Sequence, residues 1–285
     1  MKHQYFIYMI LIISTIGICS TSALAEINRY ALVIGNSNYQ ASNLKLRNPR
    51  ADAELIYREL KKIGFQTTIK NDLSLNGMKE IISTFIERSQ GAEVVLIYYA
   101  GHGIQVGGKN YLVPTDTSSK EIKLSSLLSV QSTLNKTHFN TSQFVMILDA
   151  CRNNPMSKAS ITDHQGKRLM VSRGLSISGM SNDDISRNRK TRRQKSTMIV
   201  FSTSPGDVAS DGSGTNSPFA ISFAKHLSTP SVDLSLVMRN VVKDVEMMTQ
   251  RRQSPWVNAS LSEPIFLYPL HLLDCIEVGG KKYCK

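Results

Sequence analysis

The stretch "FVMILDACRNNP", Phe144 to Pro155, decides the fold that we predict for this chain. Five apolar residues predict a buried strand, and an acid, a cysteine and a base follow at once. A strand that is apolar throughout is typical of a parallel sheet, in which ligands bind beyond the carboxyl ends of the strands. Asp149 and Cys151 therefore fall where a site is expected. Cys151 is either a small buried hydrophobe at a strand end or a nucleophile held at the edge of the sheet.

Similar apolar stretches alternate with segments of helical period along the rest of the chain. A hairpin over 104–113, turning on Gly107 and Gly108, interrupts this alternation. The whole pattern predicts an α/β three-layer sandwich with a mostly parallel central sheet of about six strands. The predicted strands cover 30–35, 65–70, 93–100, 143–149, 197–203 and 264–268, and the predicted helices cover 49–62, 75–89, 124–134, 233–248 and a segment that begins at Pro218 after the cap Ser217.

Residues 1–25 have the layout of a secretory signal peptide. A short basic start precedes an apolar segment over 5–18, and Ala23-Leu24-Ala25 is a small-residue cleavage signal before Glu26. The apolar segment is shorter than the roughly 20 residues that span a bilayer. We expect export to the periplasm or the extracellular space, without stable membrane insertion once the signal is removed. An uncleaved N-terminal anchor is the alternative.

The chain has a net charge of +12, and a large part of the basic excess lies in one segment. Residues 157–195 hold ten basic and three acidic residues with almost no apolar periodicity, which predicts a flexible loop. This loop is either simply solvated or a linker open to proteases. A third interpretation is a segment that binds polyanions. Because stacking aromatics are not interleaved with its basic residues, we expect no nucleic-acid partner.

Three cysteines remain after signal removal: Cys151, Cys275 and Cys284. The last two flank a Gly-Gly turn in the C-terminal tail, 269–285, and an oxidising compartment favours a disulfide between them. The alternative is that both are free thiols. In either case Cys151 is the odd cysteine, which is either shielded or reactive.

A second predicted strand also ends unusually, with "YYAGHGI" placing His102 between Gly101 and Gly103. A thiol is mostly protonated near neutral pH, so a nucleophilic cysteine needs a base or a cation beside it. His102 can take the proton of Cys151 and return it to a leaving amine. The glycines allow close approach of a substrate, and the N–H groups of Gly103 and Cys151 would form an oxyanion hole. Each residue alone is more often structural; together they predict catalysis.

Seven segments, in this order, resemble the caspase-like domain of the bacterial caspase–metacaspase group. They are "ALVIGNSNY", "NPRADA", "LIYYAGHGIQVGGKNYLVP", "LDACRNNP", "SRGL", "FSTSPGDVASDGSGTNSPFA" and "QSPW", and they extend over about 29–268. The histidine and the cysteine are 49 residues apart, close to the roughly 50 of caspases.

The resemblance implies a caspase-like sandwich over 26–268 that acts on protein or peptide substrates as a cysteine endopeptidase. Cys151 would be the nucleophile and His102 the base and acid, with no metal or other cofactor required. Many metacaspases need calcium, but no acidic ligand cluster in the sequence identifies such a site. The sequence does not indicate which oligomeric state the protein adopts.

The resemblance also implies a preference for Arg or Lys at P1, the substrate residue before the cut. Metacaspases bind this residue with acids in the S1 pocket, at positions that match Asp52 and Asp149. Two converging carboxylates would bind a guanidinium bidentately. The alternatives are that Asp149 caps backbone amides and that Asp52 is a solvated helix residue, with Arg47 and Arg50 close to it.

The segment 157–195 is longer and more basic than the resemblance to bacterial relatives leads us to expect. It lies where caspases are cut between their large and small subunits, so self-cleavage after one of its basic residues is a hypothesis. The alternative to an active peptidase is a catalytically silent caspase-like protein that binds peptides or partner proteins.

Overall fold

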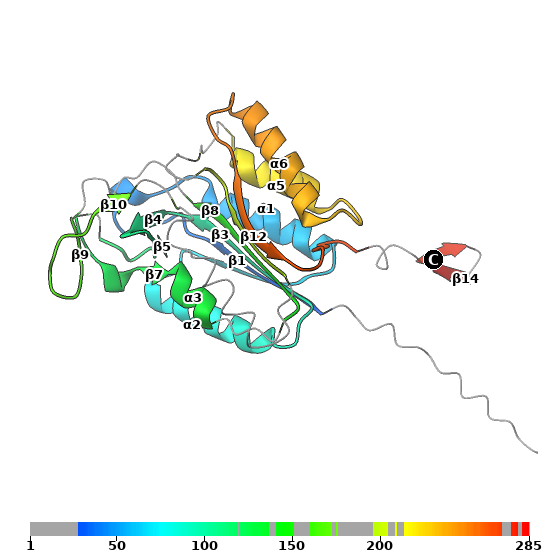
Figure 1. The fold of residues 1–285 in the computed structure, drawn as a ribbon, viewed down its shortest axis with the longest axis horizontal. Helices are drawn as coiled ribbons and strands as arrows, with labels where there is room; N and C mark the ends of the chain where they lie inside the picture. The colour runs from blue at the N-terminus through cyan, green and yellow to red at the C-terminus, as the bar shows by residue number, and fades with distance from the viewer. Residues whose placement is uncertain are drawn as a thin grey trace, which may run out of the picture.

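A computed structural model describes residues 28–118, 120–136, 141–150, 160–172, 175, 196–204, 209, 214–269, 275–278 and 281–284. Its centre is a six-stranded sheet in the order β12-β11-β8-β3-β1-β2 (Figure 1). Five of the strands are parallel, and the edge strand β12 is antiparallel. The predicted α/β sandwich is therefore confirmed. The strands are β1 (Arg29–Gly35), β2 (Gln66–Asn71), β3 (Val94–Gly101), β8 (Gln143–Ala150), β11 (Ser196–Phe201) and β12 (Trp256–Leu261).

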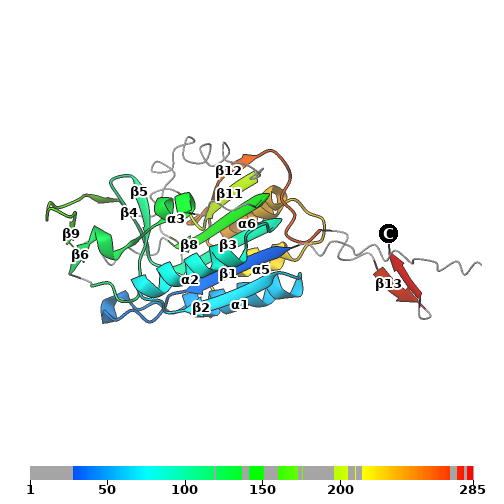
Figure 2. The ribbon, with the colours of Figure 1, turned by 90° about the horizontal axis from the view of Figure 1, so that it is seen from below.

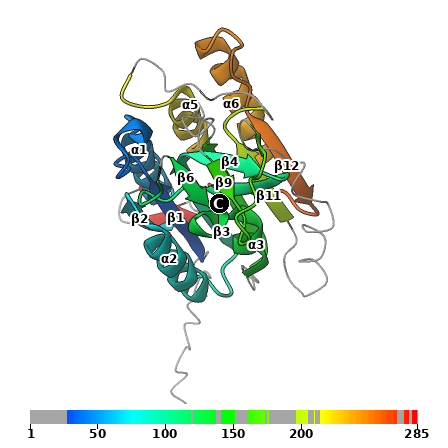
Figure 3. The same ribbon diagram turned by 90° about the vertical axis from the view of Figure 1, so that its left-hand side faces the viewer.

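Helices cover both faces of this sheet, which explains why β3 and β8 are buried along their whole length. One face packs on α1 (Pro49–Lys62), α5 (Pro218–Leu227) and α6 (Leu234–Met248), with side chains such as Tyr98 and Ile147 between the layers. The other face packs on α2 (Leu75–Arg88) and α3 (Val130–Lys136). Figure 2 shows α2 lying along the sheet, and Figure 3 shows the two helical layers on opposite sides.

The helices begin at the capping residues that their sequences provide. Ser74 accepts a hydrogen bond from the Gly77 N–H at 3.2 Å before α2, and Ser217 accepts one from the Ala220 N–H at 3.0 Å before α5. Asp233 caps α6 in the same way. Because these side chains satisfy N–H groups that have no partner inside the helix, the predicted starts of α5 and α6 are confirmed.

A smaller antiparallel sheet, β10-β4-β5-β7, begins two residues after β3 ends. Its hairpin turns on Gly107 and Gly108, both with positive φ, as predicted. A separate pair joins β6 to β9 in parallel. These strands are β4 (Gly103–Val106), β5 (Lys109–Leu112), β6 (Glu121–Lys123), β7 (Leu128–Ser129), β9 (Ser160–Thr162) and β10 (Val171–Ser172).

The prediction of an irregular loop over 157–195 is wrong for 160–172. Strand β9 pairs with β6, and β10 pairs with β4, so two strand edges take up this part of the chain. Ile161 and Leu175 are buried, yet apolar residues so far apart in a polar segment give no periodic signal. Residues 157–159, 173–174 and 176–195 lie outside the described residues.

Two other predicted elements are also wrong. The helix expected over 124–134 is a 3-10 turn (Leu124–Ser126), the strand β7 and then α3, because Leu128 pairs with Leu112 across the small sheet. The last strand is β12 rather than 264–268. That segment leaves the sheet, forms one bridge from Phe266 to Asp233, and buries Ile265 against the helical layer. Ile265 and Leu267 of this segment are buried and Phe266 is exposed, so the segment packs on the fold without forming the predicted strand.

The C-terminal tail contains a hairpin, β13 (Cys275–Val278) with β14 (Lys281–Cys284), in which Cys275 lies directly opposite Cys284. Residues directly opposite each other in an antiparallel pair have Cα atoms about 4.5–5.5 Å apart, within the range of a disulfide. The disulfide itself stays a prediction.

The signal peptide lies outside the described residues, and no helix among those described is long and apolar enough to cross a membrane.

Arg29, the first residue of β1, is a buried cation that joins three parts of the fold. Its guanidinium donates to the carbonyl oxygen of Ile63 at 2.5 Å and to that of Leu267, and it lies 4.8 Å from the ring centroid of Phe65. Burial lowers the pKa of Arg29 to about 10, so the side chain stays charged at neutral pH. It thereby ties the end of α1 and the segment 264–268 to the central sheet.

We expect Arg29→Met to lower the free energy of unfolding by about 2–4 kcal/mol, since two buried carbonyl groups lose their donor. Urea unfolding followed by circular dichroism measures this change. Arg58→Met, on the exposed side of α1, is the matched control and should cost less than about 0.5 kcal/mol. Equal losses in the two variants would show that Arg29 has no such structural role.

Candidate active site

His102 lies between β3 and β4 and is 3% exposed. Its Nε2 atom is 2.8 Å from the carbonyl oxygen of Leu44, in the 3-10 turn Ser42–Leu44. A carbonyl oxygen can only accept, so Nε2 carries the hydrogen and the neutral ring has Nδ1 as its basic nitrogen. The fold therefore selects the tautomer in which Nδ1 can take up a proton.

Two tyrosines hold the backbone of His102. The Tyr39 hydroxyl accepts from the His102 N–H at 2.8 Å, and the ring centroids of the two side chains are 4.8 Å apart. The Tyr99 hydroxyl donates to the His102 carbonyl at 2.9 Å. Burial raises the pKa of Tyr99 well above its usual value, so this hydroxyl keeps its proton and remains a donor. The histidine is thus fixed at its ring and at both of its peptide groups.

The glycines around His102 are required by contacts inside the protein. Gly101 has φ = 155°, and a Cβ there would lie 2.6 Å from the Tyr99 hydroxyl. A Cβ at Gly103 would lie 3.0 Å from Leu175 and 3.1 Å from Ala150. The sequence predicted that glycine is needed here for close approach of a substrate, and the structure adds close approach of the protein's own side chains.

Cys151 lies outside the described residues, so the predicted thiol–imidazole contact and the predicted oxyanion hole with Gly103 stay predictions. The backbone is described up to the preceding residue. In the register of β3 and β8, Gly101 pairs with Ala150. These two residues directly precede His102 and Cys151, so the two strands leave the sheet side by side at its carboxyl edge.

Asp52 and Asp149 come from different elements, and the structure links them through one residue. Ser217 donates its hydroxyl to Asp149 Oδ2 at 2.8 Å and its N–H to Asp52 Oδ1 at 2.9 Å. Asn216 Nδ2 also donates to Asp52 at 3.0 Å, and the Tyr98 hydroxyl donates to Asp149 at 3.1 Å. The two carboxylates predicted to act together therefore converge on the start of α5.

The alternative of a solvated Asp52 is wrong, since both acids are fully buried. Two side-chain hydroxyls bond to Asp149, so its role is not confined to capping backbone amides. The neighbouring arginines also lie elsewhere: Arg50 pairs with Asp72 at 3.5 Å, and Arg47 is exposed.

The sequence pointed to Ser217 only as a helix cap, and it did not point to Tyr39, Tyr98 or Tyr99. A tyrosine inside a fully apolar strand was the available signal, because a buried hydroxyl needs a partner. The carbonyl of Leu44 could not have been found, since any residue supplies one. Among the described residues, no group of three or more His, Cys, Asp or Glu side chains is placed to hold a metal ion.

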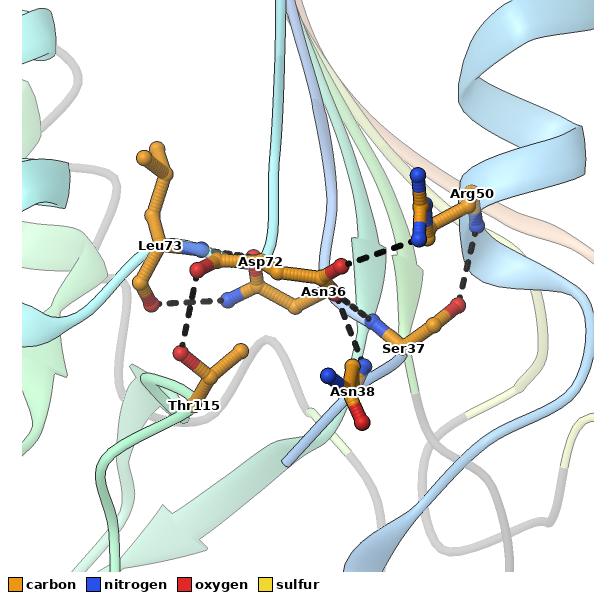
Figure 4. A network of polar contacts seen from close by, with 7 residues as sticks. All are labelled: Asn36, Ser37, Asn38, Arg50, Asp72, Leu73 and Thr115. Atoms are coloured by element: carbon orange, nitrogen blue, oxygen red, sulfur yellow. Dashed lines mark hydrogen bonds and ion pairs between the residues drawn. The ribbon is translucent and has the colours of Figure 1, made fainter. Parts of the chain in front are cut away.

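The loop that carries Tyr39 and Leu44 is fixed by a network at the ends of β1 and β2 (Figure 4). Asp72 Oδ1 accepts from the N–H groups of Ser37 and Asn38, at 2.8 and 2.7 Å. Its backbone has φ = 54°, a conformation that costs energy for a residue other than glycine. The two charge-assisted hydrogen bonds offset that cost and hold the start of the loop.

Asn36 joins the same loop to its other neighbours. Its side-chain oxygen accepts from the Leu73 N–H at 2.9 Å, and its backbone N–H donates to Ala100 at the end of β3. Thr115 donates to the Asp72 carbonyl at 3.2 Å. The ends of three strands and the loop that contacts His102 thus form one hydrogen-bonded unit.

Comparison with known proteins agrees with this arrangement. The family model of the caspase domain matches residues 28–266. The human mucosa-associated lymphoid tissue lymphoma translocation protein 1 is 30% identical over 126 residues, which are 44% of this chain and 15% of that protein. Pig caspase-1 is 24% identical over 255 residues, 85% of this chain and 60% of that protein. The chain thus covers less than two thirds of the length of these relatives.

Solved structures share the fold. Caspase-1 from Spodoptera frugiperda has a TM-score of 0.58 at 18% identity, covering 86% of this chain and 91% of its own. Protein GSU0716 from Geobacter sulfurreducens has a TM-score of 0.55 at 16% identity, covering 83% of this chain and 94% of its own. At such low identities the similarity shows the fold alone.

We expect Asp72→Ala to lower kcat for peptide hydrolysis roughly 10- to 100-fold with little change in KM, because the loop that orients His102 loses its anchor. Steady-state kinetics on a peptide substrate measures both constants. Arg50→Ala is the matched control: it removes only the exposed ion pair to Asp72 and should change kcat less than about twofold. A kcat for Asp72→Ala equal to that of Arg50→Ala would contradict this role of the network.

Proposed function

The chain belongs to the caspase-domain family of cysteine peptidases, and we propose that it is an active endopeptidase with Cys151 as nucleophile and His102 as general base and acid. The observation that carries this proposal is the hydrogen bond from His102 Nε2 to the Leu44 carbonyl. It selects the neutral tautomer that a base requires, and the same bond persists when the ring is protonated.

In the proposed reaction, His102 Nδ1 takes the proton of the Cys151 thiol, and the thiolate attacks the carbonyl carbon of the scissile bond. The N–H groups of Gly103 and Cys151 would stabilise the oxyanion. The imidazolium then gives its proton to the leaving amine, which departs and leaves a thioester. Water, deprotonated by the same histidine, hydrolyses the thioester and restores the thiol. These steps need no metal ion or other cofactor.

We propose Arg or Lys as the P1 residue, with Asp52 and Asp149 as the groups that bind it. Both carboxylates are buried, and Ser217 holds them together from two sides. A pair of fixed negative charges favours a cation and repels an aspartate side chain. A guanidinium also matches two carboxylates in geometry, because its donors form a planar fork.

We also propose that the protein works outside the cytoplasm, on protein or peptide substrates, after removal of residues 1–25. This rests on the composition of the N-terminal segment.

Fluorogenic peptides that differ only in a P1 Arg, Lys or Asp test the function. We expect the mature protein to cleave the Arg and Lys peptides and not the Asp peptide, and Cys151→Ala and His102→Ala to cleave none. Asp149→Asn should raise KM for the basic peptides at least roughly tenfold, because one buried charge of the pair is lost. If the wild type cleaved no peptide of the panel, the protein would be the catalytically silent alternative.

Self-processing follows from the same specificity. Because β9, β10 and the turn between them account for 160–172, we place the cut outside this range, after Lys158, Arg173 or one of the six basic residues between 187 and 195. Purified wild type should yield two fragments whose junction, read by mass spectrometry, follows an Arg or a Lys. Cys151→Ala should stay intact under the same conditions. A single intact chain in both preparations, while the wild type cleaves peptides, would refute self-processing.

A further inference from the structure

Two helix N-termini meet at the acidic pair Asp52 and Asp149. Asp52 lies in the first turn of α1, and its carboxylate accepts hydrogen bonds from Asn216 and Ser217, at the start of α5. Asn48, just before α1, donates to the carbonyl of Gly214 at 3.5 Å. The positive ends of both helix dipoles therefore lie near the two negative charges. This placement lowers the cost of burying two carboxylates together.

Ser217 contributes its N–H and its hydroxyl, as donor and as acceptor, to this arrangement. Its N–H donates to Asp52, its hydroxyl donates to Asp149, and its hydroxyl oxygen accepts from the Ala220 N–H. A serine hydroxyl has a single hydrogen to donate. Because this hydrogen is donated to Asp149, the side chain of Ser217 links the start of α5 to the acid at the end of β8.

The far end of α5 is also fixed. Lys225 and His226, in its last turn, bond to Asp244 of α6 at 2.7 and 2.9 Å. Phe219 and Phe223 of α5 are fully buried against the sheet. The helix thus presents Ser217 from a rigid support, which is the condition for holding a carboxylate in one orientation.

We propose that Ser217 is a specificity-determining positioning residue, which holds Asp149 beside Asp52 so that the pair accepts a P1 guanidinium bidentately. The proposal rests on the function proposed above and deepens it. Without the Ser217 hydroxyl, the Asp149 carboxylate keeps its bond from Tyr98 but loses a charge-assisted bond, and repulsion by the like charge of Asp52 then turns it away. The bond from the Ser217 N–H to Asp52 is a backbone bond, so it survives replacement of the side chain.

This role predicts an asymmetry between the two basic P1 residues. A guanidinium needs two carboxylates in a fixed relative orientation, whereas an ammonium is a compact charge that tolerates several. Loss of the hydroxyl should therefore penalise Arg more than Lys. A loss of general stability would penalise both equally.

The test compares Ser217→Ala, Ser217→Thr and Ser74→Ala. Ser74 is the matched control, because it caps α2 with the same kind of bond, and its hydroxyl donates to neither Asp52 nor Asp149. We expect Ser217→Ala to raise KM roughly tenfold for the P1 Arg peptide and about threefold for the Lys peptide, with kcat within about twofold. Ser217→Thr keeps the hydroxyl and should restore KM. Ser74→Ala should destabilise the fold as a lost cap does and leave KM unchanged.

Calorimetry with benzamidine, a small mimic of the arginine side chain, gives a readout that needs no catalysis. It is carried out in the Cys151→Ala background, where Ser217→Ala should weaken benzamidine binding roughly tenfold. Unchanged binding, or an equal rise of KM for Arg and Lys that Ser74→Ala reproduces, would overturn the role of Ser217. If the wild type cleaved no peptide but Ser217→Ala still weakened benzamidine binding, the proposed function would fail and the role of Ser217 would stand.

Discussion

The parallel pairing of β3 with β8 is the constraint on which the rest of the site depends. It brings Gly101, the residue before His102, opposite Ala150, the last described residue before Cys151. Both strands are buried throughout, which fixes their register, since a slip of one residue would turn every side chain to the other face. The helical layers that provide this burial also contribute the start of α1 and the start of α5. A single packing arrangement therefore positions His102, Asp52 and Asp149.

Two separate hydrogen-bonded frames hold the site, one around His102 and the other around the two aspartates. One frame connects Asp72 through the loop after β1 to Tyr39 and Leu44, and through them to His102. The other connects Ser217 to Asp52 and Asp149. We propose that the first frame acts on the chemical step and the second on recognition of P1. They lie on different elements, so mutations in one frame should change kcat and mutations in the other KM.

Much of this architecture could be predicted from the sequence because local signals carried it. Continuous apolar stretches predicted five of the six main strands, and caps such as Ser217 predicted most helices. The Gly107-Gly108 dipeptide predicted the hairpin. The parts that could not be predicted depend on tertiary pairing. Residues 160–162 and 171–172 become strands only because the edges of β6 and β4 accept them. Ile265 and Leu267 of the segment 264–268 pack in the core beneath the helices and do not extend the sheet. In the site, His102, Asp52 and Asp149 were predicted from the sequence. The contact with the Leu44 carbonyl and the link through Ser217 could not be predicted, because they form only when distant segments meet.

In the proposed reaction the Cys151 thiolate, with His102 as its base, attacks the carbonyl group that follows a basic P1 side chain. Labelling with a peptide chloromethyl ketone that ends in arginine, followed by mapping of the modified residue by mass spectrometry, tests this attack. We expect one covalent adduct on Cys151, formed more slowly in the presence of free benzamidine, reduced by Asp149→Asn and absent with an otherwise identical probe that ends in aspartate. An adduct on Cys151 from the aspartate probe alone, or no adduct on Cys151 from either probe, would contradict it.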